Sequence, residues 1–581
     1  MSSASSSSRS APKGREDVLA ASEGALLALL ACALLALRVG AALTSIADTD
    51  EPQHLHVAWA WTQGLVQYRD VFDNHTPLFH LLAAPVMALL GERADIVIVM
   101  RLLLIPLFAV DLWAIFRIAR AVLGVRAALW TAAFTAMLPT FFFRTMEVRP
   151  EALWIALWLL AIVLLVGGPP SWKRVFAAGL LLGAAQAASL KTVFLLSSAI
   201  GAGALLLAAP GEPRRRLPLE RGLLLAAGGA AGFALVPAVV AAWLGSLGAW
   251  DALVADVWTY NVSVGAAGPA MPRWFFALPL LAAWWLAGRW LRDRRGRGAL
   301  LRPAALFIAA TGALYFDQLR LMPFVYAQTL LPCYPFATIL AAVLATELWE
   351  SVVPRARASP AARKAALCLL TGLAVLGLAA VSREAQMGGR AAGEQTRLLA
   401  ETLRLTDPAD YVIDDKGRTV FRRRPFYPIV ESLARWRYGV GELQDTLAEQ
   451  CVAAGAFAAA EPLATFPPKT QAFLMRNYVS VGRLRVAGKE LGRRDGAAPR
   501  RFEFELAVPG RYAVVAEEGE AAGLLDGRPY VGARPLAAGS HVFLAAEGRG
   551  RLAAVWAQAV ERGFRPSAWS PAAAGPPGTP P

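Results

Sequence analysis

A polar stretch close to the N-terminus contains the residue types that acid–base chemistry needs. From Thr49 to His80 it reads T-D-E-P-Q-H-L-H-V-A-W-A-W-T-Q-G-L-V-Q-Y-R-D-V-F-D-N-H-T-P-L-F-H. Pro52 suits the first turn of a helix, which places Asp50 and Glu51 at the helix N-terminus, with Asp48 just before it. These carboxylates could simply cap the helix, or one could act as a general base. The residue types alone leave both roles open.

Histidines accompany the acids. His54 follows Asp50 by four residues and shares its helical face, whereas His54 and His56 point to different faces and are poor joint metal ligands. The proximity of Asp48, Asp50, Glu51 and His54 leaves a divalent cation open as a cofactor, but spacing does not distinguish an ion from hydrogen-bonded carboxylates. We therefore assign no metal ligands. Neither G-x-x-x-x-G-K-[ST] nor a strand-linked G-x-G-x-x-G occurs, so no nucleotide site is predicted.

Basic side chains further along the chain could meet an anionic substrate. Lys191 falls between two closely spaced apolar runs, where a charge is costly and tends to be functional. Arg149 could instead pair with Glu147 or Glu151, and Arg320 with Asp317.

The composition identifies the setting of these residues. The chain has 581 residues, 56% of them hydrophobic and only 17% charged, whereas soluble domains carry about 25% charged residues. The same values exclude a disordered chain. The net charge of +15 lies mostly in short loops between apolar runs, which is a membrane-topology pattern rather than a nucleic-acid surface. Its four cysteines form no CxxC motif, so neither a zinc knuckle nor a disulfide framework is indicated.

The fold class predicted is mainly α, a polytopic membrane protein with a C-terminal α/β and β-rich soluble region. A span needs roughly 20 apolar residues, which gives about eleven candidates near 23–43, 96–120, 126–143, 150–167, 174–190, 192–210, 222–243, 274–291, 303–317, 323–347 and 365–381. Basic residues lie in alternate loops, which predicts a cytoplasmic N-terminus. Residues 77–90 are too short to span, so 52–90 should form surface helices outside.

This topology divides the chain into segments. We predict a cytoplasmic tail (1–20), a transmembrane domain (21–381) with a first outer loop (44–95), an α/β region (382–490), a β-rich lobe (491–566) and a disordered tail (567–581). Residues 391–405 should form an amphipathic helix and 411–428 a strand–turn–strand, while Phe502, Phe504 and Leu506 alternate as in a strand. Asp414 and Asp415 adjoin Lys416 and Arg418 in a turn-like sequence and are expected to be solvated, away from the chemistry.

The motifs and their order resemble a known group. The D-E pair after the first span, Y-R-D-x-F-D-N-H-T-P-L, F-F-R-T-M-E-V-R-P-E-A-L (142–153), S-L-K-T (189–192) and F-V-Y-A-Q-T-L-L-P-C-Y-P (324–335) resemble polyprenyl-phosphate-dependent glycosyltransferases of the GT-C fold. The resemblance is to the aminoarabinose transferase and protein O-mannosyltransferase superfamily (glycosyltransferase family 39). It covers about residues 20–350.

The resemblance implies inverting transfer of a sugar from a polyprenyl phosphate to a lipid, glycan or protein acceptor at the outer face of a plasma membrane of the bacterial inner-membrane type. Asp50 matches the family's catalytic acid, with Glu51 and Asp48 as substitutes. His75, Arg149, Lys191 and Arg320 are the implied phosphate ligands, although relatives often carry Lys at the position of His75. His54, Tyr326 and Gln328 are candidates for sugar or acceptor binding.

Two other functions remain open at this point. An O-antigen ligase or polymerase would place a large catalytic outer loop late in the chain, whereas here the acids lie in the first. A transporter would need ionisable groups at mid-membrane, and Asp111 is the candidate, although it is expected to pair with Arg117.

Overall fold

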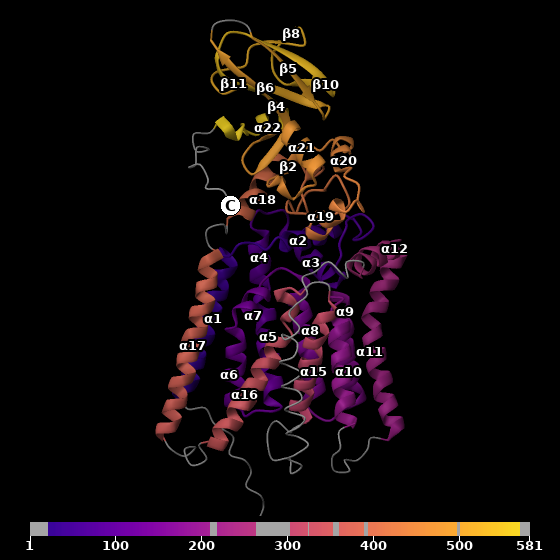
Figure 1. Ribbon diagram of the computed structural model, residues 1–581, viewed down its shortest axis with the longest axis vertical. Helices are drawn as coiled ribbons and strands as arrows, with labels where there is room; N and C mark the ends of the chain where they lie inside the picture. The colour runs from indigo at the N-terminus through magenta and orange to yellow at the C-terminus, as the bar shows by residue number, and fades with distance from the viewer. Residues whose placement is uncertain are drawn as a thin grey trace, which may run out of the picture.

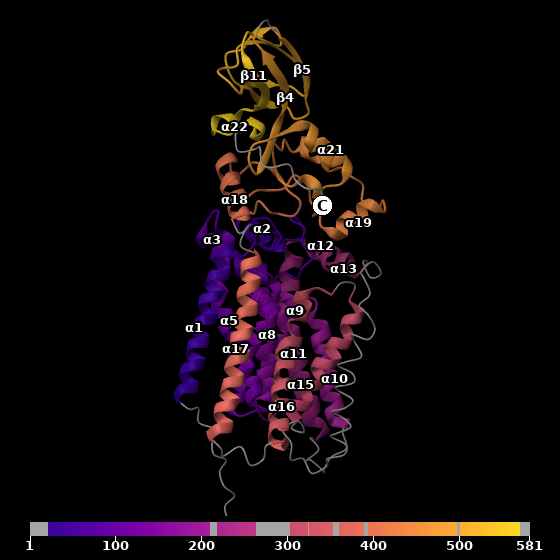
Figure 2. The same ribbon diagram turned by 60° about the vertical axis from the view of Figure 1, so that its left-hand side comes forward.

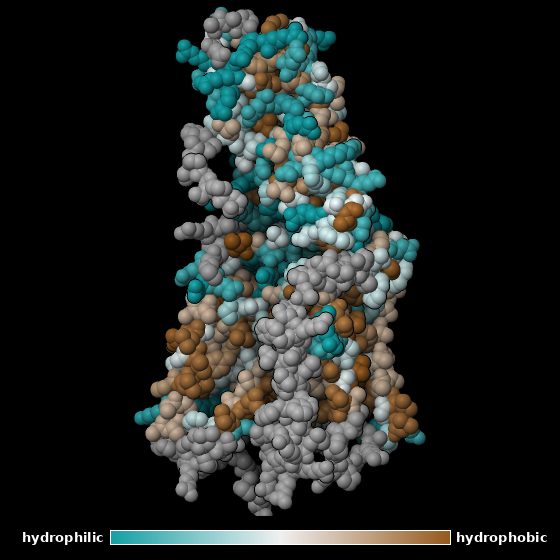
Figure 3. Space-filling model, viewed as in Figure 1, coloured by the Kyte–Doolittle hydropathy of each residue, from teal (hydrophilic) through white to brown (hydrophobic). Residues whose placement is uncertain are grey.

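The computed structural model describes residues 21–208, 218–262, 303–322, 325–352, 360–388, 393–496 and 500–569. Long helices form a bundle at one end of an elongated molecule, and the C-terminal region stands on the other end (Figures 1 and 2). Apolar side chains cover the bundle surface, whereas hydrophilic ones dominate the C-terminal region (Figure 3). The prediction of a mainly helical chain with a C-terminal β-rich region is confirmed.

The helices of the bundle and its upper end are α1 (Ala21–Thr44), α2 (Asp50–Thr62), α3 (Leu78–Leu90), α4 (Ile96–Leu103), α5 (Ile105–Arg120), α6 (Val125–Ala136), α7 (Pro139–Arg144), α8 (Pro150–Val166), α9 (Trp172–Ala188), α10 (Thr192–Ala208), α11 (Leu219–Ser246), α12 (Trp250–Leu253), η1 (Val254–Thr259), α13 (Tyr260–Val262), α15 (Pro303–Gln318), η3 (Leu319–Leu321), η4 (Ala327–Leu330), α16 (Cys333–Val352) and α17 (Pro360–Gly388).

Helices lie over every predicted span except 274–291, which falls outside the described residues. Within the described chain, four helical segments are long and apolar enough to cross a membrane: Ala21–Thr44, Ile96–Arg120, Leu219–Ser246 and Lys364–Gln386. Shorter apolar helices are Leu78–Leu90, Pro150–Val166, Thr192–Leu206 and Cys333–Trp349. The predicted number of spans therefore stays a prediction.

Helices α2 and α3 lie at the end of the bundle that carries the C-terminal region (Figure 1). Helix α3 has 13 residues, so it extends only about 20 Å at 1.5 Å per residue, which is short of the roughly 30 Å hydrocarbon core. Beneath them, α9 and α11 pack with their backbones in contact. A Cβ on Gly179 or Gly183 would approach a backbone oxygen of α11 to 2.2 Å, which is why small residues recur at this spacing between membrane helices.

The mid-span acid Asp111 does not pair with Arg117 as predicted. Asp111 lies within electrostatic range of Arg38 on α1, whereas the Arg117 guanidinium packs over the ring of Trp113, 5.8 Å from its centre. The expected pairing was wrong because the neighbouring helix, rather than the next turns of the same helix, faces Asp111.

The C-terminal region combines short helices with two sheets. Its helices are α18 (Glu394–Leu405), α19 (Ser432–Gly439), α20 (Leu447–Ala453), η7 (Leu463–Thr465), α21 (Pro468–Asn477), α22 (Ala557–Glu561) and η8 (Ser567–Trp569). Its strands are β1 (Val412–Ile413), β2 (Ala458–Ala460), β3 (Tyr478–Ser480), β4 (Leu484–Asp495), β5 (Arg500–Leu506), β6 (Gly510–Ala516), β7 (Gly523–Leu525), β8 (Arg528–Pro529), β9 (Arg534–Leu536), β10 (Gly539–Ala545) and β11 (Arg549–Trp556).

One sheet has the order β1-β2-β4-β11-β6-β9, with β3 also paired to β4, and the other has the order β5-β10-β7-β8. In β5 the alternating residues Phe502, Phe504 and Leu506 are buried, as their spacing indicated. Strand β4 continues through residue 490, so the two predicted segments share a sheet. The expected strand–turn–strand at 411–428 is wrong: only β1 forms there, and a single bridge joins Tyr411 to Arg423.

Candidate active site

The three acids at the start of α2 make different contacts. Asp48 Oδ1 accepts the backbone N–H of Asp50 at 3.0 Å, and the backbone N–H of Asp48 donates to Glu51 Oε2 at 2.9 Å. These reciprocal bonds satisfy the helix start in the manner of a capping box. The carboxylate of Asp50 is not used in them. The capping role therefore applies to Asp48 and Glu51 but leaves Asp50 unexplained.

Two cations hold Asp50. Arg149 Nη2 lies 2.7 Å from its Oδ2, and Lys416 Nζ donates to its Oδ1. Burial opposes ionisation of Asp50, but Arg149 and Lys416 outweigh it and lower the pKa of the carboxyl. Asp50 is therefore a carboxylate at neutral pH with both oxygens engaged.

Glu51 is more deeply buried than Asp50. Its fully buried carboxylate receives Arg101 Nε at 2.8 Å and Nη2, as well as the backbone N–H of Val148 at 2.9 Å. Arg101 also donates to the carbonyls of Ser45 and Ile46 at 3.0 and 2.9 Å. This pair joins the end of α1 to α2, α4 and the segment before α8, so it positions the acids around it.

The segment before α8 supplies further charges. Arg144 Nη1 donates to Asp48 Oδ2 at 3.0 Å and to Glu147 Oε1 at 2.6 Å. Arg149 Nη1 lies 3.2 Å from Asp48 Oδ1, and its Nε lies 3.5 Å from Glu151 Oε2. Burial raises the pKa of Glu147 to about 8, against the attraction of Arg149 and with Asp48 adding to the rise. Arg149 thus pairs with Glu151, one of the alternatives that the sequence left open. It also lies among the acids at the start of α2.

Lys191 lies where α9 ends and α10 begins, and its Nζ donates to Glu151 Oε1 at 2.6 Å. Because Glu151 also faces Arg149 Nε, the S-L-K-T motif is joined to the α2 entry through one carboxylate. Asp50, Arg149 and Lys191, which are far apart in sequence, therefore meet at one end of the bundle.

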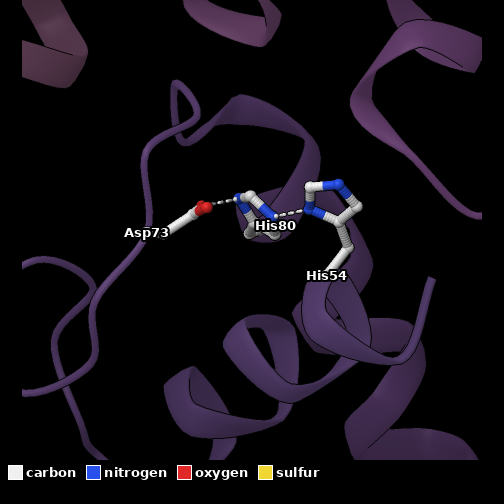
Figure 4. Close-up of side chains that lie close together, drawn as sticks. All are labelled: His54, Asp73 and His80. Atoms are coloured by element: carbon white, nitrogen blue, oxygen red, sulfur yellow. Dashed lines mark hydrogen bonds and ion pairs between the residues drawn. The ribbon is translucent and has the colours of Figure 1, made fainter. Parts of the chain in front are cut away.

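Three buried polar side chains form a line beside this cluster (Figure 4). Asp73 Oδ2 lies 3.4 Å from His80 Nδ1, and His80 Nε2 lies 3.0 Å from His54 Nδ1. Gln67 Nε2 donates to Asp73 Oδ2 at 2.7 Å. The other Asp73 oxygen, Oδ1, lies 2.9 Å from His75 Nδ1. Asp73 thereby orients two imidazoles, and His54 packs edge-on against His75 with ring centres 4.6 Å apart.

This line bears on metal binding. His54, Asp73 and His80 offer ligand atoms within 4.8 Å of one another. His54 Nδ1 and His80 Nε2 face each other, but Asp73 contacts the opposite nitrogen of His80. A cation between the imidazoles would therefore have Asp73 as a partner of its ligand His80, an arrangement known for zinc-bound histidines. The contacts are equally those of a hydrogen-bonded relay.

The remaining predicted residues differ in how closely they are connected to the cluster around Asp50. Arg320 pairs with Asp317 at 2.9 Å and its side chain is 58% exposed; within the described residues no contact joins it to Asp50. Tyr326 is close enough to Glu431 and Asp50 that both add to burial in raising the pKa of its hydroxyl. Gln328 is buried in η4.

The expectation that Asp414 and Asp415 are solvated is wrong, and their neighbour Lys416 is not solvated either. All three are buried, because the loop that carries them docks on α2: the Val420 carbonyl lies 2.8 Å from His56 Nδ1. Lys416 consequently reaches Asp50. Glu431, from the same region, feels both residues electrostatically, and burial raises the pKa of its carboxyl. Adjacent acids beside a lysine were the only sequence signal, and solvated turns carry the same pattern.

Known proteins are similar to this chain in one segment of its sequence and in its fold. Residues 74–243 match the family model described as dolichyl-phosphate-mannose-protein mannosyltransferase. A comparison with curated protein sequences found no match. ArnT from Cupriavidus metallidurans is similar both in the apo state and bound to undecaprenyl phosphate, each with a TM-score of 0.53, 15% identity, and coverage of 81% of this chain and 98% of that chain. An Archaeoglobus fulgidus oligosaccharyltransferase tethered with an acceptor peptide has a TM-score of 0.44, 11% identity, and coverage of 78% of this chain and 72% of that chain.

The likeness to ArnT covers nearly the whole of that protein and about four fifths of this chain. At 15% identity it establishes the fold. The family match independently covers the segment from Asn74 to Trp243, which includes Arg149 and Lys191. The chain accordingly has the GT-C fold of membrane glycosyltransferases, as the sequence motifs predicted.

Proposed function

We propose that this protein is a membrane glycosyltransferase that moves one sugar from a polyprenyl phosphate to a hydroxyl of a lipid, glycan or protein acceptor, with inversion at the anomeric carbon. The observation that carries the proposal is Asp50. It is the acid at the α2 entry that its helix does not use, and it lies among cations contributed by separate motifs. The similar fold of ArnT from Cupriavidus metallidurans, which binds undecaprenyl phosphate, supports the class of donor.

The chemistry requires a base and a site for a leaving anion. Asp50 takes the proton of the acceptor hydroxyl while the oxygen forms a bond to the anomeric carbon and the bond from that carbon to the phosphate oxygen breaks. Negative charge then develops on the departing polyprenyl phosphate, where preorganised cations stabilise it most. Arg149, Lys191 and His75 take this role. Arg101 and Glu51 position the base, and Asp48 holds Arg144 and Arg149 beside it.

The other predicted residues have supporting roles in this proposal. Tyr326 and His54 are near Asp50 and contribute to sugar or acceptor binding, as does Gln328, which is buried in η4. Arg320, being exposed and paired with Asp317, is a peripheral contact for lipid headgroups. The site faces the outer side of a plasma membrane, as the alternation of basic loops favours, and the C-terminal region lies on the same side.

Replacement of the base tests the proposal. The exchange Asp50→Asn keeps the size of the side chain but removes its basicity, so transfer from a polyprenyl-phosphate sugar should fall at least about 100-fold, the lower range for acid–base catalysis. Transfer would be measured with purified protein and a radiolabelled donor. The exposed acid Asp251, on α12 at the same end of the bundle, supplies the control Asp251→Asn, which should transfer normally. Near-normal turnover of Asp50→Asn together with loss in Asp48→Asn would reassign the base to Asp48.

A further inference from the structure

Lys416 is an unusual member of the cluster because it comes from the C-terminal region. Its side chain is only 9% exposed, and its ammonium group contacts Asp50 across 366 positions of sequence. A buried lysine is costly unless it is paired. An ammonium group has three donors, and within the described chain Lys416 Nζ uses one acceptor, Asp50 Oδ1. Donors therefore remain for a second anion.

The loop around Lys416 is built to hold it in place. Asp414 accepts the backbone N–H of Gly417 and, at 2.9 Å, that of Thr419, and it also accepts the Thr419 hydroxyl at 2.5 Å. The backbone N–H of Val430 donates to the Asp415 carbonyl at 2.7 Å. Gly417 has φ +91°, and a Cβ there would lie 2.8 Å from that of His56 on α2. The backbone of this loop is therefore held against α2, and Lys416 can move mainly by rotation about its side-chain bonds.

Three cations act on the single carboxylate of Asp50. Arg149, Lys416 and His75 are the cations that act on it, and both of its oxygens are occupied by the first two. A carboxylate held by two cations is a poor base, because accepting a proton would abandon both interactions. A competing anion that attracted these cations would restore its basicity.

We propose that Lys416 is a ligand of the donor phosphate and that it moves from Asp50 to this phosphate when the donor binds. The phosphate then engages Lys416 and Arg149 together, and Asp50 is released to accept the proton of the acceptor. In this arrangement the C-terminal region completes the membrane site, and the base is freed only when the donor is present. The inference rests on the proposed function.

Binding of undecaprenyl phosphate to the full-length protein tests this role. The probe would be titrated into detergent-solubilised wild type, Lys416→Met, Lys416→Arg and Asp50→Asn, with affinity measured by microscale thermophoresis and folding by thermal unfolding. The control is Lys469→Met, because Lys469 pairs with Glu449 on the surface of the same region. In Lys416→Met, the loss of a charge-assisted hydrogen bond should weaken the affinity for undecaprenyl phosphate about tenfold or more. Lys416→Arg should recover most of this loss, and Lys469→Met should bind like wild type.

Asp50→Asn separates this role from that of a simple latch between the two regions. If Lys416 is a phosphate ligand, removing the competing carboxylate should leave binding as tight as in wild type or tighter. If the ion pair only holds the regions together, Asp50→Asn and Lys416→Met should weaken binding by similar factors, which would overturn the inference. Unchanged affinity in folded Lys416→Met would also overturn it. Failure of folded wild type to bind undecaprenyl phosphate would instead refute the proposed function itself.

Discussion

Ion pairs at the α2 entry and ion pairs on the surface of the C-terminal region use the same residue types in different surroundings. The partners Arg101 and Glu51 are almost fully buried, whereas Lys469 and Glu449 are each 57% exposed and Arg501 and Glu503 are more exposed still. A buried pair must recover the cost of desolvating two charges, and an exposed pair contributes little to stability. The difference agrees with the proposed role of the α2 entry, in which its charges serve positioning and chemistry rather than stability.

The largest effect on stability is expected from Arg101→Met. This change leaves Glu51 buried without its cation, and loss of one partner of a buried pair costs about 3–5 kcal/mol. Thermal unfolding in detergent should show a marked decrease of the midpoint. Arg93→Met is the matched control, because Arg93 pairs with Asp95 in the same segment but is exposed. Equal shifts in the two variants would remove the contrast between buried and exposed pairs.

A smaller effect should follow Gly417→Ala. The backbone there is left-handed, and the added Cβ would meet three atoms of His56 at 2.8 to 3.0 Å. Gly441→Ala isolates the backbone cost, since φ is +81° there and nothing lies within 4 Å of the new Cβ; that cost is about 1 kcal/mol. Gly417→Ala should lower the unfolding midpoint further than Gly441→Ala and reduce transfer by displacing Lys416. Identical behaviour would mean that the loop is not seated on α2.

Asp73→Asn should change the pH dependence of donor binding. Burial opposes the charge of His75, but Asp73, through its charge and its hydrogen bond, and Glu151 raise the pKa of His75 overall. The imidazolium is therefore present at low pH and is lost as pH rises through this raised pKa. In Asp73→Asn the decline in affinity for undecaprenyl phosphate should occur at lower pH. Asp70→Asn, which alters a pair with exposed Arg69, is the control, and an unmoved midpoint in Asp73→Asn would exclude His75 from the phosphate site.

The smallest effect is expected from Lys469→Met on the outer surface of the C-terminal region. Its pair with Glu449 is solvated on both sides, and exposed pairs often contribute nothing measurable. Thermal unfolding should show no change of the midpoint outside experimental error. A shift comparable to that of Arg101→Met would show that exposure does not separate the two classes of pair.

The bundle and one part of the site could be predicted from sequence because both depend on local patterns. Apolar runs locate the helices, and the D-E-P sequence places Asp50 and Glu51 at a helix start. Lys416 could not be predicted, since its contact with α2 depends on how a distant loop packs. In the sequence, its neighbours Asp414 and Asp415 resemble solvated turn residues. Only the close approach of Gly417 to His56 in the structure shows that this loop packs on α2.

The distance along the chain between Asp50 and Lys416 has a consequence for biosynthesis. Asp50 follows α1, the first of the described helices, whereas Lys416 is synthesised after α17, when the described helices of the bundle have already been made. During that interval Asp50 lacks its second cation, and the nascent bundle has a less neutralised acidic site. Full assembly of the site therefore depends on the docking of the C-terminal region after the described helices have been synthesised.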